Sequence, residues 1–269
     1  MAKCLQNLHT HSTYCDGKDT IEEMILAACE KGLRSIGFSS HAFWKGLPVP
    51  KQVIDNYKYE IAEFKKKFAD KIEVFCGLEC EMHGDMDLCG FDYLIGAVHY
   101  LPLGNEFVCF DWSAQDVQTI IQQYFGGDGM AYAKAYYQQL AQLPQHGSFD
   151  IIAHFDLITK HCEKVQFFDR SSKEYQWAAI EAAEQLAGKI PYFEVNTGAM
   201  ARGYRTSPYP DMFLLKELKR LGFGAIISTD CHDSRFLDYG YQDAVEVLRE
   251  CGFKEQFILT KDGFIPTEL

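Results

Sequence analysis

Histidines and acidic residues recur along the whole chain, each time at or just after a short apolar segment. The first set is His9-Thr10-His11, and on an extended segment two side chains separated by one residue point to the same side. The later sets are Asp16, Ser39-Ser40-His41, Gly77-Leu78-Glu79, Val98-His99, Ala153-His154 and Thr229-Asp230-Cys231-His232. Imidazole nitrogens and carboxylate oxygens suit zinc, manganese or iron, and one carboxylate can bridge two cations. The pattern therefore favours a site for several divalent metal ions.

Taken singly, these residues have ordinary explanations. An isolated H-x-H pair is weak evidence for a metal site, because short motifs often match by accident. His99 or His154 alone fits a buried, hydrogen-bonded histidine, Asp16 before a glycine fits a turn, and Asp230 fits a helix cap. The combined pattern is more informative, because six of the nine histidines fall at the ends of predicted strands.

The elements that must position these residues alternate between strands and helices. Apolar patterns predict strands at 5–8, 34–39, 72–78, 93–98, 150–153, 191–195 and 225–228. Helical spacing predicts helices at 20–31, 50–69, 115–143 with an interruption at 126–129, 172–187, 210–221 and 241–250. This alternation predicts a parallel sheet, and about seven β-α units in one domain (residues 1–269) predict a (β/α)7 barrel. A barrel brings the C-terminal ends of its strands to one rim, where these polar residues would meet.

Composition narrows the classes of partner. The net charge of -12 disfavours a general electrostatic grip on nucleic acid, although bound cations would reverse the field locally for an anionic substrate. No apolar run is long enough for a membrane helix, and no signal peptide is visible, which predicts a cytoplasmic protein with no membrane partner. In that compartment the ten cysteines are expected to be reduced.

The order of the motifs H-x-H, S-x-x-x-D-G, S-S-H, G-L-E, V-H, H-F-D and T-D-C-H resembles the polymerase-and-histidinol-phosphatase (PHP) superfamily. The resemblance implies a distorted seven-stranded β/α barrel that holds two or three divalent metals, with zinc, manganese and iron left open. The ligands that it implies are His9, His11, Asp16, His41, Glu79, His99, His154, Asp230 and His232. Glu79 matches the family's G-x-E and would bridge two metals, with Glu81 as the alternative. Asp16 stands where many members carry histidine.

Within the superfamily, residues 97–99, 154–158 and 193–198 resemble the histidinol phosphate phosphatases. That resemblance implies the hydrolysis of L-histidinol phosphate to L-histidinol and phosphate in histidine biosynthesis, through a hydroxide held by the metals. Asp230 would orient or deprotonate the water, with Glu79 and His232 completing the catalytic set. The substrate-binding candidates are Arg202, with Arg205 as the alternative arginine, Asn196 and Lys160.

The other end of such a substrate carries an amine and an imidazole, which acidic or aromatic residues could select. From position alone, the candidates are Asp87, Phe43 and Trp44. The acidic surplus of the chain fits a cationic group of this kind better than it fits DNA.

Two other activities share the predicted metal site: a phosphodiesterase or exonuclease, and a phosphatase of another small phosphate monoester. The acidic balance and the lack of a basic, aromatic strip disfavour nucleic acid. A metal-binding regulatory protein is the non-enzymatic alternative, and the complete set of ligands argues against it. The sequence leaves the oligomeric state and the leaving-group acid open.

Overall fold

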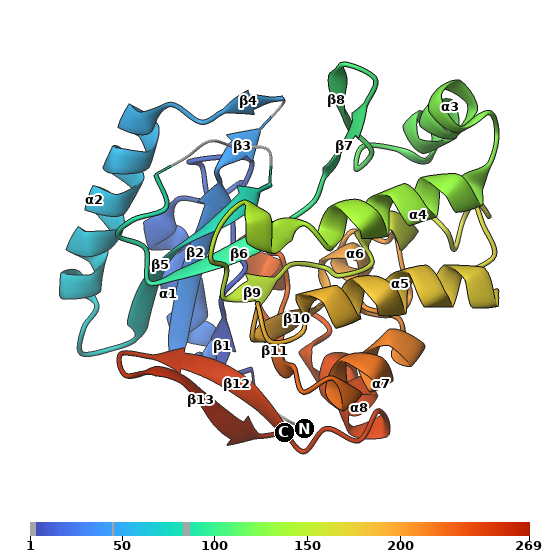
Figure 1. The fold of residues 1–269 in the computed structure, drawn as a ribbon. Coiled ribbons are helices and arrows are strands. Elements are labelled where there is room, and N and C mark those ends of the chain that lie inside the picture. Colours follow the sequence, from blue (N-terminus) through green and yellow to red (C-terminus); the bar gives the residue numbers. More distant parts are fainter. Residues whose placement is uncertain (1–3, 45, 83–86) are drawn as a thin grey trace.

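The main sheet is parallel and curls into a nearly closed barrel (Figure 1). The computed structural model describes residues 4–44, 46–82 and 87–269. Seven strands pair in the order β1 (Gln6–Asn7), β2 (Ser35–His41), β5 (Glu73–Glu81), β6 (Tyr93–Ala97), β9 (Ile151–Ile152), β10 (Tyr192–Asn196) and β11 (Gly224–Ser228). A parallel bridge between Thr10 and Cys231 joins the two ends of the sheet just beyond β1 and β11. The predicted (β/α)7 barrel is thus confirmed.

The helices surround the barrel and follow the predicted ranges closely, except for a short helix at 198–201 that was not predicted. They are α1 (Ile21–Lys31), α2 (Lys51–Lys67), α3 (Ala114–Phe125), α4 (Gly129–Leu140), α5 (Lys173–Leu186), α6 (Gly198–Ala201), α7 (Met212–Arg220) and α8 (Tyr241–Glu250). Thr20 and Glu23 form a capping box that starts α1. The predicted interruption near 126–129 separates α3 from α4, because Gly126 ends one helix with φ 60° and Asp128 caps the next.

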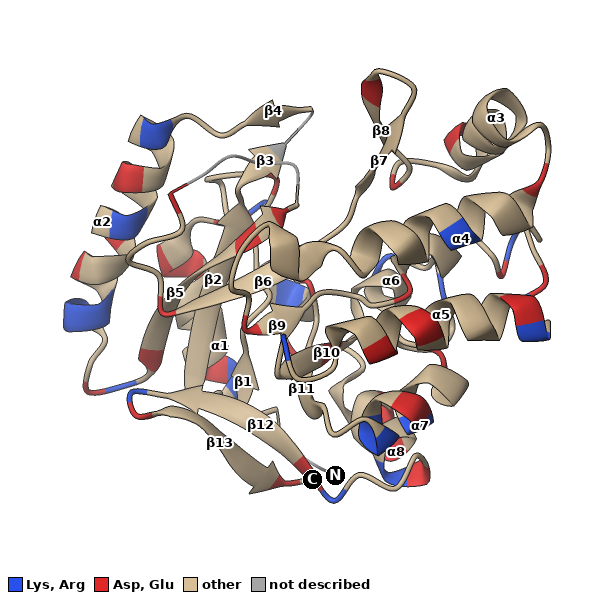
Figure 2. Ribbon diagram, in the orientation of Figure 1, with Lys and Arg blue, Asp and Glu red and all other residues tan. Residues whose placement is uncertain are grey.

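Acidic and basic residues are interspersed on the outer helices, most visibly along α2 (Figure 2). On this helix Lys51 pairs with Asp55, and Lys66 pairs with Glu63. Such pairs are typical of a solvated helix face. Among the described residues, no helix combines the length and the apolar character needed to cross a membrane.

Three antiparallel hairpins were not predicted. They pair β3 (Phe43–Trp44) with β4 (Leu47–Pro48), β7 (Tyr100–Leu103) with β8 (Glu106–Cys109), and β12 (Glu255–Thr260) with β13 (Gly263–Glu268). The first two follow the C-terminal ends of β2 and β6, whereas the last covers the opposite end of the barrel (Figure 1). Gln6 joins that last hairpin to β1 by accepting from the backbone N–H of Leu259 and donating to its carbonyl.

One tyrosine of the buried cluster crosses from β6 towards β1 and β2. The buried Tyr93 hydroxyl donates to the carbonyls of Leu8 and Phe38, which precede the polar ends of their strands. Its ring occupies the space above Gly37 and Gly77, where an added Cβ would overlap the phenol. Glycine at both positions is therefore required for this crossing, and the tyrosine forms part of the floor beneath the rim.

Replacing Gly77 by alanine should lower the free energy of unfolding by about 1–3 kcal/mol, because the new methyl group collides with the Tyr93 ring. Urea denaturation of Gly77→Ala, Tyr93→Leu and the double variant checks the cause. The penalty of the alanine should largely disappear in the background that lacks the ring. An equal penalty in both backgrounds would refute the steric explanation.

Candidate metal centre

The buried Glu79 side chain stands at the centre of the candidate site, at the end of β5. It is 2% exposed, and both of its oxygens face imidazoles. The distances to Oε2 are 3.0 Å from His41 Nδ1, 3.3 Å from His9 Nε2 and 3.6 Å from His11 Nε2. The distances to Oε1 are 3.2 Å from His154 Nε2 and 3.5 Å from His99 Nε2. One carboxylate thus faces histidines that follow four different strands of the barrel.

The structure gathers all nine predicted ligands at this rim, in groups that could each hold a metal ion. The groups are His11, Asp16, His41 and His232; His9, His11 and Asp230; and Glu79, His99 and His154. His11 belongs to two of them, and within each group the ligand atoms lie within 4.8 Å of one another. Asp16 reaches its group even though the family often carries histidine there, with Oδ2 3.3 Å from His232 Nε2.

The chemistry of the buried atoms fits cations. His9 Nε2, His11 Nε2 and Glu79 Oε2 are buried, and in the described part of the chain they find no well-formed hydrogen bond. Burying such atoms without a partner is unfavourable, and buried polar atoms are normally satisfied. All three are atoms that ligate zinc, manganese or iron. These three buried atoms, which lack hydrogen bonds, therefore make the site suitable for divalent metal ions.

The charge of the buried carboxylates also favours bound cations. Burial by itself raises the pKa of Glu79, but His9, His41 and His99 outweigh it and hold that pKa well below its usual range. Burial lowers the pKa of His41, yet Glu79 and then Asp16 outweigh burial and raise that pKa well above its ordinary value. The carboxylates therefore stay ionised at neutral pH and stabilise positive charge around them.

Glu81, the alternative bridging residue, has a different partner. Its Oε2 accepts from the backbone N–H of His99 at 2.7 Å and lies 3.1 Å from His99 Nδ1. It therefore braces one imidazole from behind, on the side away from Glu79. This geometry favours Glu79 for the bridging position.

Asp230 stands at the end of β11 in a backbone conformation that is uncommon for a residue with a side chain, with φ 46°. Its Oδ1 faces His11 Nε2 at 3.2 Å, and its Oδ2 accepts from Arg202 at 2.7 Å. Burial raises the pKa of Asp230, but Arg202 and then His9 outweigh it and hold that pKa well below its usual range. A second nitrogen of the same guanidinium donates to the Asp230 carbonyl at 2.9 Å, so Arg202 fixes both the backbone and the side chain.

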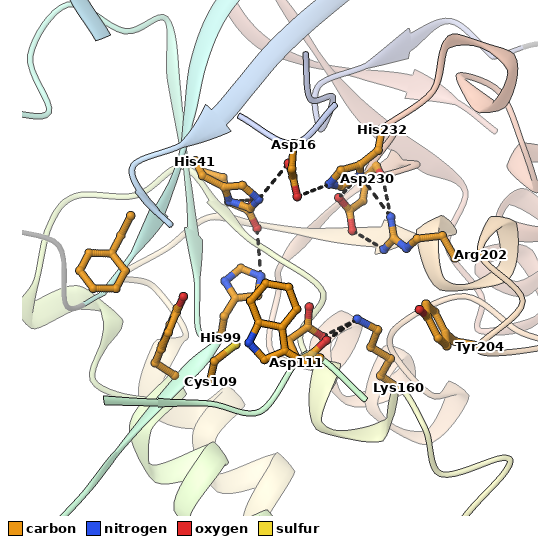
Figure 3. Close-up of a pocket in the computed structure, with 14 residues that line it drawn as sticks. Asp16, His41, His99, Cys109, Asp111, Lys160, Arg202, Tyr204, Asp230 and His232 are labelled. Carbon is orange, nitrogen blue, oxygen red and sulfur yellow. Dashed lines mark hydrogen bonds and ion pairs between the residues drawn. The ribbon is translucent and has the colours of Figure 1, made fainter. Parts of the chain in front are cut away.

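A cavity of about 340 Å³ opens over these groups (Figure 3). Asp16, His41, Glu79, His99, Asp230 and His232 line its floor together with Arg202. Its other walls are the aromatic or acidic side chains of Phe43, Tyr100, Asp111, Trp112 and Tyr204, with Cys109 and Lys160. Lys160 Nζ donates to Asp111 Oδ1 at 2.8 Å and to its carbonyl at 2.7 Å. Figure 3 shows this pair across the cavity from Asp16.

Arg205, the alternative arginine, lies outside the cavity lining. Its side chain is 0% exposed, and it donates to Asp211 Oδ1 at 2.6 Å and to the Thr159 hydroxyl. Its guanidinium stacks on the Tyr209 ring at 4.5 Å. Burial and Asp211 raise the pKa of the adjacent Asp156 to about 7, with Arg205 opposing them. These contacts give Arg205 a structural role and leave Arg202 as the arginine at the metal groups.

Other sequence candidates also lie away from the cavity. Asn196 is buried, donates to Glu194 Oε1 at 2.7 Å and accepts from the Gly198 N–H. Asp87 accepts from the Cys89 N–H at an exposed turn. Phe43 does line the cavity, whereas the Trp44 side chain falls outside the described residues.

Several residues of the site escaped the sequence reasoning, among them Tyr100 and Trp112 in the cavity walls and also Asp111, Tyr204 and Glu194. Asp111 follows the unpredicted β7–β8 hairpin, and Tyr204 lies in the loop after α6. Glu194 was visible as a charged residue inside an apolar strand, between Phe193 and Val195. A buried charge of this kind needs a partner, and this signal would have found it.

The barrel and its ring of histidines and carboxylates define the class of protein. The chain belongs to the PHP domain family, whose model matches residues 7–198. Asp230 and His232 lie beyond the matched segment and join the same groups through the fold.

Particular relatives are named as histidinol phosphatases. A protein of Deinococcus radiodurans assigned as a histidinol-phosphatase is 24% identical over 265 residues, covering 91% of this chain and 92% of its own length. A structure from Listeria monocytogenes, also assigned as a histidinol phosphatase, covers 88% of this chain and 99% of its own with 19% identity and TM-score 0.76. Histidinol phosphate phosphatase of Lactococcus lactis, solved with zinc, L-histidinol and phosphate, covers 98% and 100% with 19% identity and TM-score 0.73. At these identities the two structures establish a shared fold.

The two arginines should respond differently to replacement. Arg205→Met should lower the free energy of unfolding by about 3–5 kcal/mol, because it removes a buried cation beside the buried Asp156 and leaves Asp211 with Arg170 alone. Arg202→Met should lower it less, since that side chain is 33% exposed and histidines also face Asp230. Urea denaturation of both variants measures the difference, and similar losses would contradict the structural role of Arg205.

Proposed function

We propose that this protein is a histidinol-phosphatase that hydrolyses L-histidinol phosphate to L-histidinol and phosphate at a centre of two or three divalent metal ions. Zinc, manganese and iron are all compatible with the ligands. Membership of the PHP family and the histidinol-phosphatase relatives support this reading. The complex of the Lactococcus lactis relative with zinc, L-histidinol and phosphate supports it as well.

The observation that carries the proposal is that the cavity lining combines two chemically distinct kinds of side chain. The ligand groups and Arg202 suit a phosphate dianion once cations are bound. The remaining lining includes Asp111 and the rings of Tyr100, Trp112 and Tyr204, which suit a cationic and aromatic group. L-histidinol phosphate carries a phosphate at one end and an amine with an imidazole at the other.

Divalent cations in the three groups would supply positive charge for the phosphate and lower the pKa of water. The chain's own residues do the rest. Arg202 is held by Asp230 and lines the cavity, so its guanidinium can bind phosphate oxygens. Asp230 is ionised because its pKa is held low, and it orients the attacking water more readily than it takes a proton from it.

Asp111 and Lys160 would recognise the rest of the substrate. Asp111 is already paired with Lys160 Nζ at 2.8 Å, which fixes the position of the carboxylate. That carboxylate can still accept hydrogen bonds from a substrate ammonium. Lys160 also lies over the Tyr204 ring at 4.9 Å. This arrangement favours a substrate that carries both charges.

The test is phosphate release by metal-reconstituted protein from L-histidinol phosphate, an aryl phosphate and a phosphodiester. We expect kcat/KM to be highest for L-histidinol phosphate. Asp230→Asn should lower kcat by about 100-fold or more on every substrate that is cleaved, the order of loss seen when a preorganised catalytic group is removed. Preference for the diester would reassign the protein to the phosphodiesterase alternative. A preference for another monoester would refute L-histidinol phosphate as the substrate but not the phosphatase activity.

Asp111→Asn is the matched variant that tests substrate selection. It should lower the ratio of kcat/KM for L-histidinol phosphate over the aryl phosphate by about 10- to 100-fold, the worth of a hydrogen bond to a charged group. The aryl phosphate has no cation, so its own kcat/KM should not fall. Equal losses on both substrates would show that Asp111 maintains the site and does not select the substrate.

A further inference from the structure

Glu194 is a fully buried carboxylate that lies behind the metal groups and belongs to none of them. It is 1% exposed and sits in the middle of β10, on the inner side of the barrel. Four donors converge on its two oxygens. Oε2 lies 2.9 Å from His9 Nδ1 and accepts from the Ser228 hydroxyl. Oε1 accepts from the His154 backbone N–H and from Asn196 Nδ2, both at 2.7 Å.

The contact with His9 decides which ring nitrogen of that histidine carries hydrogen. An ionised carboxylate offers only acceptors, so Nδ1 of His9 must be the donor. Nε2 is then the nitrogen left to give a lone pair to a cation, and it is a buried atom that lacks a hydrogen bond within the described structure. Nε2 points towards Glu79 at 3.3 Å and Asp230 at 3.5 Å, the position from which His9 can ligate a cation.

Through the His154 backbone N–H, the same carboxylate also contacts a second group of candidate metal ligands. His9 belongs with His11 and Asp230, whereas His154 belongs with Glu79 and His99. The two histidines follow β1 and β9, which are not neighbours in the sheet. Through its two oxygens Glu194 therefore holds ligands of both groups in one hydrogen-bonded unit.

We infer that Glu194 is a positioning residue of the metal centre, which fixes His9 as the Nδ1–H tautomer and ties it to the strand end that carries His154. This inference rests on the proposed metal centre. A purely structural role for the same carboxylate would stabilise the protein without altering its affinity for metal. The two roles therefore separate in a binding measurement.

Glutamine is the informative replacement. If its Oε1 keeps accepting from His154 N–H and Asn196, its amide NH₂ faces His9 Nδ1 as a donor. Nδ1 must then accept, which forces hydrogen onto Nε2 and removes the lone pair directed at the metal groups. Glu194→Gln nearly preserves the volume of the side chain, so its effect reports the hydrogen-bond pattern more than the packing.

The experiment is a competition titration of metal-free protein with Zn²⁺ against a chromophoric chelator, for the wild type and Glu194→Gln. We expect the variant to bind Zn²⁺ about 10- to 100-fold more weakly at one class of site, the usual effect of losing such a partner. Unfolding midpoints with chelator and with excess Zn²⁺ provide a second readout. The stabilisation by Zn²⁺ should shrink in the variant by the amount that its weaker affinity predicts.

Two control variants separate positioning from general damage. Ser228→Ala removes one donor to Glu194 and leaves the His9 contact in place. The Zn²⁺ affinity should therefore change by less than about 3-fold, which is below the effect expected for Glu194→Gln. Asp150→Asn alters another carboxylate that accepts a backbone N–H, from Leu94 at 2.8 Å, at the far end of β9. It should alter stability and leave Zn²⁺ affinity unchanged.

Unchanged Zn²⁺ affinity in a folded Glu194→Gln protein would overturn the inference, as would an equal loss in Asp150→Asn. If Glu194→Gln does not fold, Glu194→Asp takes its place. This variant keeps the charge but is too short to reach His9 and His154 together, and it should also weaken Zn²⁺ binding. None of these readouts depends on substrate. If the wild type binds Zn²⁺ but does not hydrolyse L-histidinol phosphate, the proposed function is refuted and the inference about Glu194 is not.

Discussion

A carboxylate buried among imidazoles is the constraint on which the rest of the structure depends. Glu79 is almost inaccessible to water, and a charge in that position is tolerated only where positive charge and polar partners surround it. Five histidines lie within 3.6 Å of its two oxygens. A parallel barrel meets this demand because all of its strands end at the same rim, so residues far apart in sequence converge there. In β2 and β5, His41 and Glu79 are direct register partners.

The centre is built in layers, and each layer has its own chemistry. The innermost imidazoles and carboxylates face one another, and behind them lie acceptors that fix the rings, such as Glu81 behind His99. The cavity over them also has aromatic walls, together with the paired Asp111 and Lys160. This order follows from position: the barrel interior excludes water and supports buried hydrogen bonds, whereas the hairpins beyond β2 and β6 are free to vary and form the walls around a substrate.

Much of this arrangement could be read from the sequence because the strong signals were local. Each strand of the barrel is a short apolar run that ends in a polar residue, and the nine residues so marked converge at one rim. The residues that form the cavity walls could not be predicted in the same way. Asp111 follows the β7–β8 hairpin, which was not predicted although both of its strands are largely apolar. Its role also depends on Lys160, 49 residues away. The two arginines differ only in whether tertiary partners enclose them, as Asp211 encloses Arg205, and a loop sequence does not encode that.

The tyrosine that crosses the barrel links three strands by shape as well as by hydrogen bonding. Tyr93 occupies the space that glycines leave in β2 and β5, and its hydroxyl reaches the carbonyl just before His9. Gly37, Gly77 and Tyr93 therefore form one packing unit. In related chains these three positions should co-vary: a smaller residue at the tyrosine position would permit side chains at the glycine positions, and a change at one glycine alone would be rare. Such a correlation would mark the floor of the metal site in an alignment even though none of the three residues is a ligand.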